Sequence, residues 1–150
     1  MITAVIDTNV FVSALITGGT PLQALETVRT GLVQLLITTQ IEAEIENTLT
    51  RAKFAPYFQR QETKPQKFLA NYTTIARYMS PVQVLDCPIE DKKDLMLIEC
   101  AVAGQADYIV SGDHHLLDLG YYKNITILRP AHGELKQKQH DYNQRLCHLK

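Results

Sequence analysis

Residues 2–7 read Ile-Thr-Ala-Val-Ile-Asp, a short, largely apolar run that ends directly in an acid. A run of this length is typical of a strand buried inside a sheet. Similar runs occupy residues 32–38, 108–110 and 125–128, and a weaker one occupies residues 82–85. Helical patterns lie between them, and this alternation predicts a three-layer α/β/α domain with a central parallel sheet.

The helices are expected where apolar residues recur every three or four positions. In the helix expected over residues 40–51, for example, Ile41, Ile45 and Leu49 form one apolar face. Thr20 and Pro21 have the residue types that begin a helix. The expected helices cover residues 20–31, 40–51 and 91–104, two more lie between 54 and 79, and a helical turn lies at 116–119.

The composition is that of one ordinary globular domain. The chain has 150 residues, of which 45% are hydrophobic and 21% charged, so it is not a disordered protein. No apolar run approaches the ~20 residues that span a bilayer, and the start lacks the basic region of a signal peptide. Its three cysteines fit neither a disulfide framework nor a zinc motif, so we expect a cytoplasmic protein. We expect a catalytic domain over residues 1–130 and a helical tail over 131–150, packed on that same domain.

Charges of opposite sign alternate in blocks along the chain. Residues 1–50 carry a net charge of −4, 51–77 of +5, 78–122 of −6 and 123–150 of +4. This arrangement suits a cation site beside a surface that binds a polyanion.

Four acids from distant parts of the chain are predicted to lie at one edge of the sheet. Asp7 follows the first strand, and Asp113 follows the strand over 108–110 through Ser-Gly. Glu44 and Asp94 lie in the first turns of helices that leave the second and third strands. Ligands of open parallel sheets bind at this carboxyl edge.

Such a cluster of carboxylates needs compensation, because neighbouring negative charges repel one another. Mg²⁺ or another hard divalent cation with oxygen ligands is the usual solution. Two such ions about 3.5–4 Å apart support phosphodiester hydrolysis, so the chemistry points to a metal-dependent nuclease. Glu26 and Asp107 are expected at the opposite edge and serve as internal controls.

Each acid also has an ordinary structural interpretation. Asp7 could cap the first helix, and Glu44 with its acidic neighbours could form a solvated helix face. Asp91 and Asp94 have the spacing of a helix cap and its partner, and Asp113 could be a turn residue. The agreement of four separate elements on one edge is what favours a functional interpretation.

Two motifs carry a resemblance to a known family. Residues 5–10 read Val-Ile-Asp-Thr-Asn-Val, and residues 109–113 read Ile-Val-Ser-Gly-Asp, followed by Leu116-Leu117. With the segments 41–53 and 91–103, they resemble PIN domains over about residues 2–130. The resemblance is greatest to the PIN-type, VapC-like toxin components of bacterial toxin–antitoxin systems.

The resemblance implies a Mg²⁺- or Mn²⁺-dependent endoribonuclease that hydrolyses RNA, often a homodimer and often neutralised by a protein antitoxin. It places the catalytic and metal-binding acids at Asp7, Glu44, Asp94 and Asp113. It gives supporting roles to Asn9, beside the first acid, and to Ser111, which orients a carboxylate. Relatives often carry another acid directly after the position of Asp94; Leu95 stands there, and Asp91 could substitute.

The positive block suggests an RNA-binding surface made by Arg51, Lys53, Arg60, Lys64 and Lys67. Aromatic residues at positions 54, 57, 58, 68 and 72 are interleaved with it and could stack on bases. The alternative is that these aromatics are core residues and the basic side chains are merely solvated. For the adjacent histidines 114 and 115, an exposed loop position is favoured over substrate contact.

Two other functions remain open at this point. One is a catalytically silent PIN-like module that binds RNA or metal without turnover. The other is a phosphate-receiving signalling domain, which would carry paired acids at the end of its first strand, where this chain has only Asp7.

Overall fold

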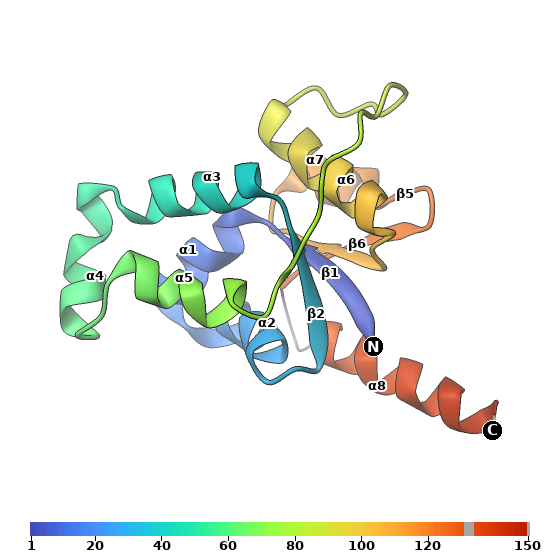
Figure 1. The fold of residues 1–150 in the computed structure, drawn as a ribbon, viewed down its shortest axis with the longest axis horizontal. Coiled ribbons are helices and arrows are strands. Elements are labelled where there is room, and N and C mark those ends of the chain that lie inside the picture. Colours follow the sequence, from blue (N-terminus) through green and yellow to red (C-terminus); the bar gives the residue numbers. More distant parts are fainter. Residues whose placement is uncertain (131–133, 150) are drawn as a thin grey trace.

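The protein forms one six-stranded sheet with the strand order β3-β2-β1-β4-β6-β5 (Figure 1). The structure, a computed structural model, describes residues 1–130 and 134–149. Neighbouring strands from β3 to β6 run parallel, and β5 pairs antiparallel with β6. The strands are β1 (Ile2–Ile6), β2 (Val33–Ile37), β3 (Arg77–Tyr78), β4 (Tyr108–Val110), β5 (Tyr121–Tyr122) and β6 (Ile125–Leu128).

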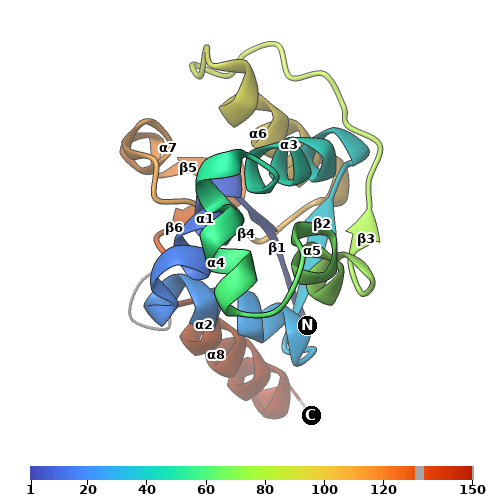
Figure 2. The same cartoon turned by 90° about the vertical axis from the view of Figure 1, so that its left-hand side faces the viewer.

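Helices cover both faces of this sheet, as the two ribbon views show (Figures 1 and 2). Ala4, Val5 and Ile6 point alternately to opposite faces of β1, and all three are at most 1% exposed. The three-layer α/β/α architecture is therefore confirmed. The helices are α1 (Thr8–Thr17), α2 (Gly19–Arg29), α3 (Thr39–Leu49), η1 (Ala52–Phe54), α4 (Ala55–Arg60), α5 (Pro65–Thr73), α6 (Lys92–Gly104), α7 (His114–Leu119) and α8 (Glu134–His148).

The strand expected at residues 82–85 is wrong. The third parallel strand is β3, and the segment from 79 to 90 has no regular helix or strand. Both residues of β3 are exposed at the edge of the sheet, so they carry no apolar signal. Leu85, which suggested a buried strand, is instead 85% exposed.

Helix α8 packs at the amino edge of the sheet, away from α3, α6 and α7 (Figure 1). Leu135 is buried there, and the side chain of Gln139 accepts a hydrogen bond of 2.9 Å from the backbone of Ile2. Of the expected tail, residues 131–133 and 150 lie outside the described residues. None of the described helices combines the length and apolar character needed to cross a membrane.

The close approach of α6 to β2 yields a test of the packing. A methyl group at Gly104 would lie 2.5 Å from Cδ1 of Leu36, and because Leu36 is fully buried, its side chain can shift only against its packed neighbours. We expect Gly104→Ala to lower the free energy of unfolding by about 1–3 kcal/mol in urea titrations, although Ala is the better helix former. Gly112→Ala is the control, because its added carbon meets nothing within 4 Å. A Gly104→Ala variant as stable as the wild type would contradict this packing.

Candidate metal centre

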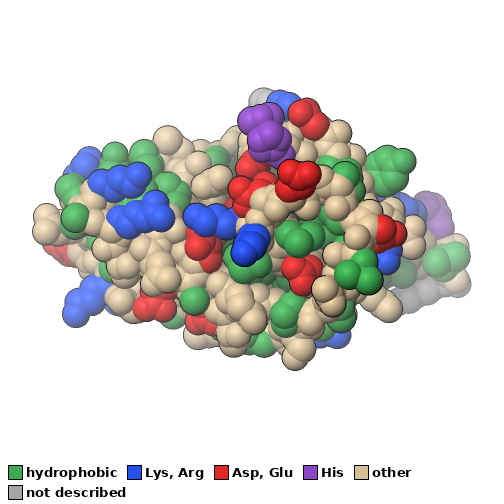
Figure 3. Space-filling model, turned by 90° about the horizontal axis from the view of Figure 1, so that it is seen from above, with side chains coloured by type: hydrophobic (Ala, Val, Ile, Leu, Met, Phe, Trp, Pro, Cys, Tyr) green, Lys and Arg blue, Asp and Glu red, His purple; other side chains and the backbone are tan. Residues whose placement is uncertain are grey.

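A hollow of about 200 Å³ opens beside the carboxyl ends of β1 and β4, and all four predicted acids line it. They arrive from four different parts of the chain: the end of β1, α3, α6 and the end of β4. The other residues of its wall include Asn9, Arg51, Asp91 and Lys93. In Figure 3 the acidic side chains gather in the middle of this face.

The two control acids lie elsewhere. Glu26 forms an ion pair with Arg29 on α2, and Asp107 accepts a hydrogen bond from the backbone of Thr3, near the start of β1. Neither lines the hollow. The four acids in the hollow therefore share one feature that the two control acids lack. Each lies at the end of a strand or near the start of the helix that follows it.

Asp7 is held in place by the neighbouring strand. Its backbone N–H donates to the carbonyl of Val110 (2.9 Å), which joins the ends of β1 and β4. Its carboxylate makes no capping hydrogen bond to α1 and instead accepts 2.6 Å from the buried hydroxyl of Ser111. Asp7 therefore occupies the N-cap position of α1, as one interpretation of the sequence had it, but its side chain is held by Ser111. Burial raises the pKa of Asp7, and the hydrogen bond from Ser111 offsets part of that rise.

Ser111 connects two of the acids. While its hydroxyl donates to Asp7, its oxygen accepts a hydrogen bond of 3.0 Å from the backbone N–H of Asp113. Ser111 is completely buried, so this link is shielded from water. It fixes the loop after β4 relative to the end of β1.

Of the helix cap and capping partner that the spacing of Asp91 and Asp94 suggested, the structure shows Asp91 as the cap. Asp91 caps α6 by accepting 2.8 Å from the backbone N–H of Lys93, whereas Asp94 points into the hollow with 6% of its surface exposed. Burial, and then the nearby carboxylates of Asp113, Asp7 and Asp91, raise the pKa of Asp94 to about 6. Asp94 is therefore a carboxyl group whose charge the protein alone stabilises poorly.

Glu44 has a positive partner that the sequence analysis did not identify. Lys93 precedes Asp94 in the chain, but its Nζ lies 3.2 Å from Oε1 of Glu44. Glu42, on the same helix, points to β3 and accepts a hydrogen bond from the hydroxyl of Tyr78. Only Glu44 of the acids on α3 lines the hollow. The sequence analysis missed Lys93 because a position in the chain does not show which residue of another helix a long side chain contacts.

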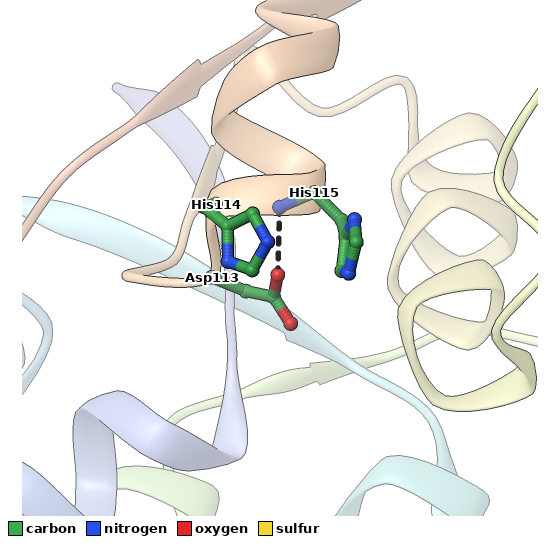
Figure 4. Close-up of side chains that lie close together, drawn as sticks. All are labelled: Asp113, His114 and His115. Carbon is green, nitrogen blue, oxygen red and sulfur yellow. Dashed lines mark hydrogen bonds between the residues drawn. The ribbon is translucent and has the colours of Figure 1, made fainter.

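Asp113 caps α7 and also lines the hollow. Its Oδ1 accepts 2.8 Å from the backbone N–H of His115, and the side chains of His114 and His115 lie beside its carboxylate (Figure 4). Its structural role is therefore that of a helix cap and not of a turn residue, and this role leaves the carboxylate at the edge of the site. Both histidines are exposed, as expected, but they lie in the first turn of α7 and not in a loop.

Comparison with known proteins identifies the family. The family model for the PIN domain matches residues 3–115. The chain belongs to the PIN domain family. A chain in the crystal structure of VapBC2 from Rickettsia felis, bound to a DNA fragment from their promoter, has a similar fold with a TM-score of 0.55. The sequences are 14% identical, and the match covers 85% of this chain and 98% of that one. The comparison with curated proteins gives no match.

The hollow of this PIN domain has the donor set of a hard divalent cation. Asp7, Asp94 and Asp113 contribute carboxylate oxygens, the ligands that Mg²⁺ and Mn²⁺ prefer. Among the described residues, the ion pair of Lys93 with Glu44 is the salt bridge made by these acids, so the three aspartates have no basic partner of their own. A bound cation would compensate the repulsion that raises the pKa of Asp94.

The raised pKa of Asp94 predicts how stability depends on pH. Since about 6 lies above its ordinary 3.8, ionising Asp94 disfavours the folded state, and the metal-free protein should lose stability as pH rises from about 4 through 6. Asp94→Asn removes this charge. We expect its unfolding temperature, measured in chelator, to exceed that of the wild type at pH 7, and the difference to vanish near pH 4.

The matched control is Asp118→Asn, which removes an exposed carboxylate of α7. It should leave the unfolding temperature nearly unchanged at both pH values. An Asp94→Asn variant less stable than the wild type at pH 7 in chelator would show that the ionised carboxylate stabilises the fold.

Proposed function

We propose that this PIN domain is a metal-dependent endoribonuclease, the toxin component of a toxin–antitoxin system. The observation that carries the proposal is the gathering of Asp7, Glu44, Asp94 and Asp113 in one hollow. Burial at this site raises the pKa of two of them, Asp7 and Asp94. A structural role alone does not explain why a protein would collect charges that oppose its own folding.

In this proposal Asp7, Asp94 and Asp113 hold Mg²⁺ or Mn²⁺, and Glu44 completes the ligand set directly or through water. When bound, such a cation makes water a better nucleophile and neutralises charge on the phosphodiester. Ser111 and Asp91 are positioning residues, because the first fixes the Asp7 carboxylate and the second fixes the start of α6. Asn9 lines the same hollow beside Asp7.

Lys93 gives the site a positive group of its own. Its ammonium lies against Glu44 at the wall of the hollow, where a phosphate oxygen of the substrate could replace that carboxylate as its partner. In the proposed reaction Lys93 orients Glu44 before RNA binds and contacts the backbone of RNA afterwards. Lys93 is 65% exposed at its side chain, so this exchange needs no change in the fold.

RNA would reach the hollow from the α4 end of the molecule. Lys and Arg side chains gather at that end, beside the acids (Figure 3). Arg51 lines the hollow itself, and the exposed residues Lys53, Arg60, Lys64 and Lys67 follow along η1, α4 and α5. Their charges suit successive phosphates of one strand.

The aromatic residues of this segment do not support base stacking. Phe54, Phe58, Phe68 and Tyr72 are buried at 8% exposure or less, and edge-to-face contacts join the last three. The guanidinium of Arg60 lies 4.8 Å from the ring centre of the half-buried Tyr57. The interpretation of these aromatics as core residues holds, and binding here would depend on phosphates without reading the bases.

The toxin assignment rests on family and fold. The chain is a PIN domain, and its fold resembles a chain of a VapBC2 complex. We infer a protein antitoxin and a homodimer as partners, and the cytoplasm as the compartment. A small DNA-binding protein encoded by the neighbouring reading frame would support the assignment.

The second candidate is a catalytically silent module that binds RNA or metal. It is favoured by Leu95, which stands where relatives often carry a further acid, and by the pairing of Glu44 with Lys93. Both features lower the negative charge available for cations. Cleavage of RNA in the presence of a divalent cation distinguishes the nuclease from the silent module.

Cleavage of single-stranded RNA tests the enzyme directly. We expect the purified protein to cut RNA in Mn²⁺ or Mg²⁺ and to stop in chelator. Asp7→Asn and Asp94→Asn should each lower the rate by at least about 100-fold, because each removes a charged ligand of the cation. The products should carry 5′-phosphate and 3′-hydroxyl ends.

The control variant is Glu26→Gln, which changes a half-buried acid of α2 outside the hollow and should retain full activity. Cleavage that persists in chelator or in Asp7→Asn would exclude the metal mechanism. RNA binding without cleavage would favour the silent module.

The basic surface predicts a change in salt dependence. In an Asp7→Asn background that binds without cutting, Lys53→Gln with Arg60→Gln should reduce the slope of log affinity against log salt by about 0.7 for each phosphate that the variant no longer neutralises. Fluorescence anisotropy with single-stranded RNA measures this slope. Lys138→Gln with Arg145→Gln removes the same charge from α8 and should leave the slope unchanged. If both double variants reduced the slope equally, RNA would not bind preferentially at the α4 end.

A further inference from the structure

Two histidines and an aspartate meet at the rim of the acidic hollow. The ligand atoms of Asp113, His114 and His115 all lie within 4.8 Å of one another. The two imidazole rings are 4.1 Å apart between centroids and tilted by 37°. Figure 4 shows the rings on either side of the Asp113 carboxylate. The group contains imidazole nitrogens, and no histidine among the described residues lines the acidic hollow.

The local fold holds these three residues together. Asp113 is the cap of α7, and its carboxylate is oriented by the backbone N–H of His115. Leu116 follows and is completely buried, which anchors the first turn of the helix in the core. His114 and His115 therefore remain on the solvent side, where rotation of their side chains can close the distances to a shared ion.

A second hollow adjoins the same group. Its volume is about 540 Å³, and its walls include His115 and the carboxyl groups of Asp94, Asp91, Glu90 and Asp118. Acids on the wall attract dications to this place and raise their local concentration. A hydrated ion therefore has both space and an electrostatic reason to approach the two imidazoles.

The donor types determine which ions fit. Imidazole nitrogen suits zinc, copper and nickel, whereas magnesium prefers oxygen and holds its waters. Two nitrogens and one carboxylate provide three protein ligands, which is the set of a zinc site with one open position.

We propose that Asp113, His114 and His115 form a binding site for a transition-metal dication of the zinc class, separate in its nitrogen ligands from the acidic hollow. Asp113 belongs to both. An ion held by the histidines withdraws this carboxylate from the cation in the hollow. It follows that Zn²⁺ inhibits RNA cleavage, and this consequence rests on the proposed function.

Calorimetric titration with Zn²⁺, at one fixed Mg²⁺ concentration for every variant so that the acidic hollow contributes equally, tests the site without RNA. The double variant His114→Ala with His115→Ala should bind Zn²⁺ at least about tenfold more weakly than the wild type. The control variant, His140→Ala with His148→Ala, removes two exposed histidines of α8 and should bind as the wild type does. An unchanged affinity in the first variant, or an equal loss in the second, overturns the site.

Co²⁺ in place of Zn²⁺ provides a spectroscopic signature. Nitrogen ligation at a four-coordinate site should produce visible absorption bands in the wild type that His114→Ala with His115→Ala abolishes. Identical spectra in the two proteins would contradict ligation by these imidazoles. Thermal unfolding of the variant checks that the exposed substitutions leave the fold intact.

Two further arms separate this inference from the proposed function. Asp7→Asn should bind Zn²⁺ at least as tightly as the wild type, because Asp7 is outside the group and its loss weakens the competing cation in the hollow, although the variant no longer cleaves RNA. The double histidine variant should cleave RNA in Mn²⁺ but lose inhibition by Zn²⁺; inhibition equal to that of the wild type would refute the link through Asp113. If the wild type cleaves no RNA, the proposed function fails, and the Zn²⁺ titration still decides the site.

Discussion

The burial of carboxylates close to one another, with the repulsion between them, is the constraint around which this edge of the protein is organised. Asp7 and Asp94 are buried at 8% and 6% exposure, and the nearby charges of Asp113 and Asp7 add to the effect of burial on Asp94. Separating these groups would relieve the repulsion, yet the sheet holds them together. The protein offsets part of it through the Ser111 hydroxyl and the Lys93 ammonium. The remainder is the physical basis for a bound cation.

The parallel sheet enforces this gathering. Parallel strands present their carboxyl ends at one edge, and the backbone bond from Asp7 to Val110 aligns the ends of β1 and β4. The third and fourth acids come from α3 and α6, which begin close to the same edge. Rigid strands and capped helices thus place side chains that are far apart in the chain within one hollow. The two histidines of α7 lie beside Asp113, at the rim of this hollow.

The sequence predicted those features of the fold and the site that depend on the direction of the chain and on the periodicity of its apolar residues. The end of an apolar strand locates Asp7 and Asp113, and the start of an amphipathic helix locates Glu44, so their common edge follows without coordinates. It did not predict β3, because a two-residue edge strand such as Arg77–Tyr78 has no buried face to carry a signal. It could not show that Lys93 reaches Glu44 instead of Asp94, which depends on the spacing of α3 and α6.

Anomalous diffraction from crystals grown with Mn²⁺ tests most directly whether these acids share a cation. The account predicts a strong anomalous peak among the carboxylates of Asp7, Asp94 and Asp113, within bonding distance of at least two of them, and its loss in Asp94→Asn crystals. A map without density in the hollow at saturating Mn²⁺, with the three side chains turned apart into solvent, would contradict it.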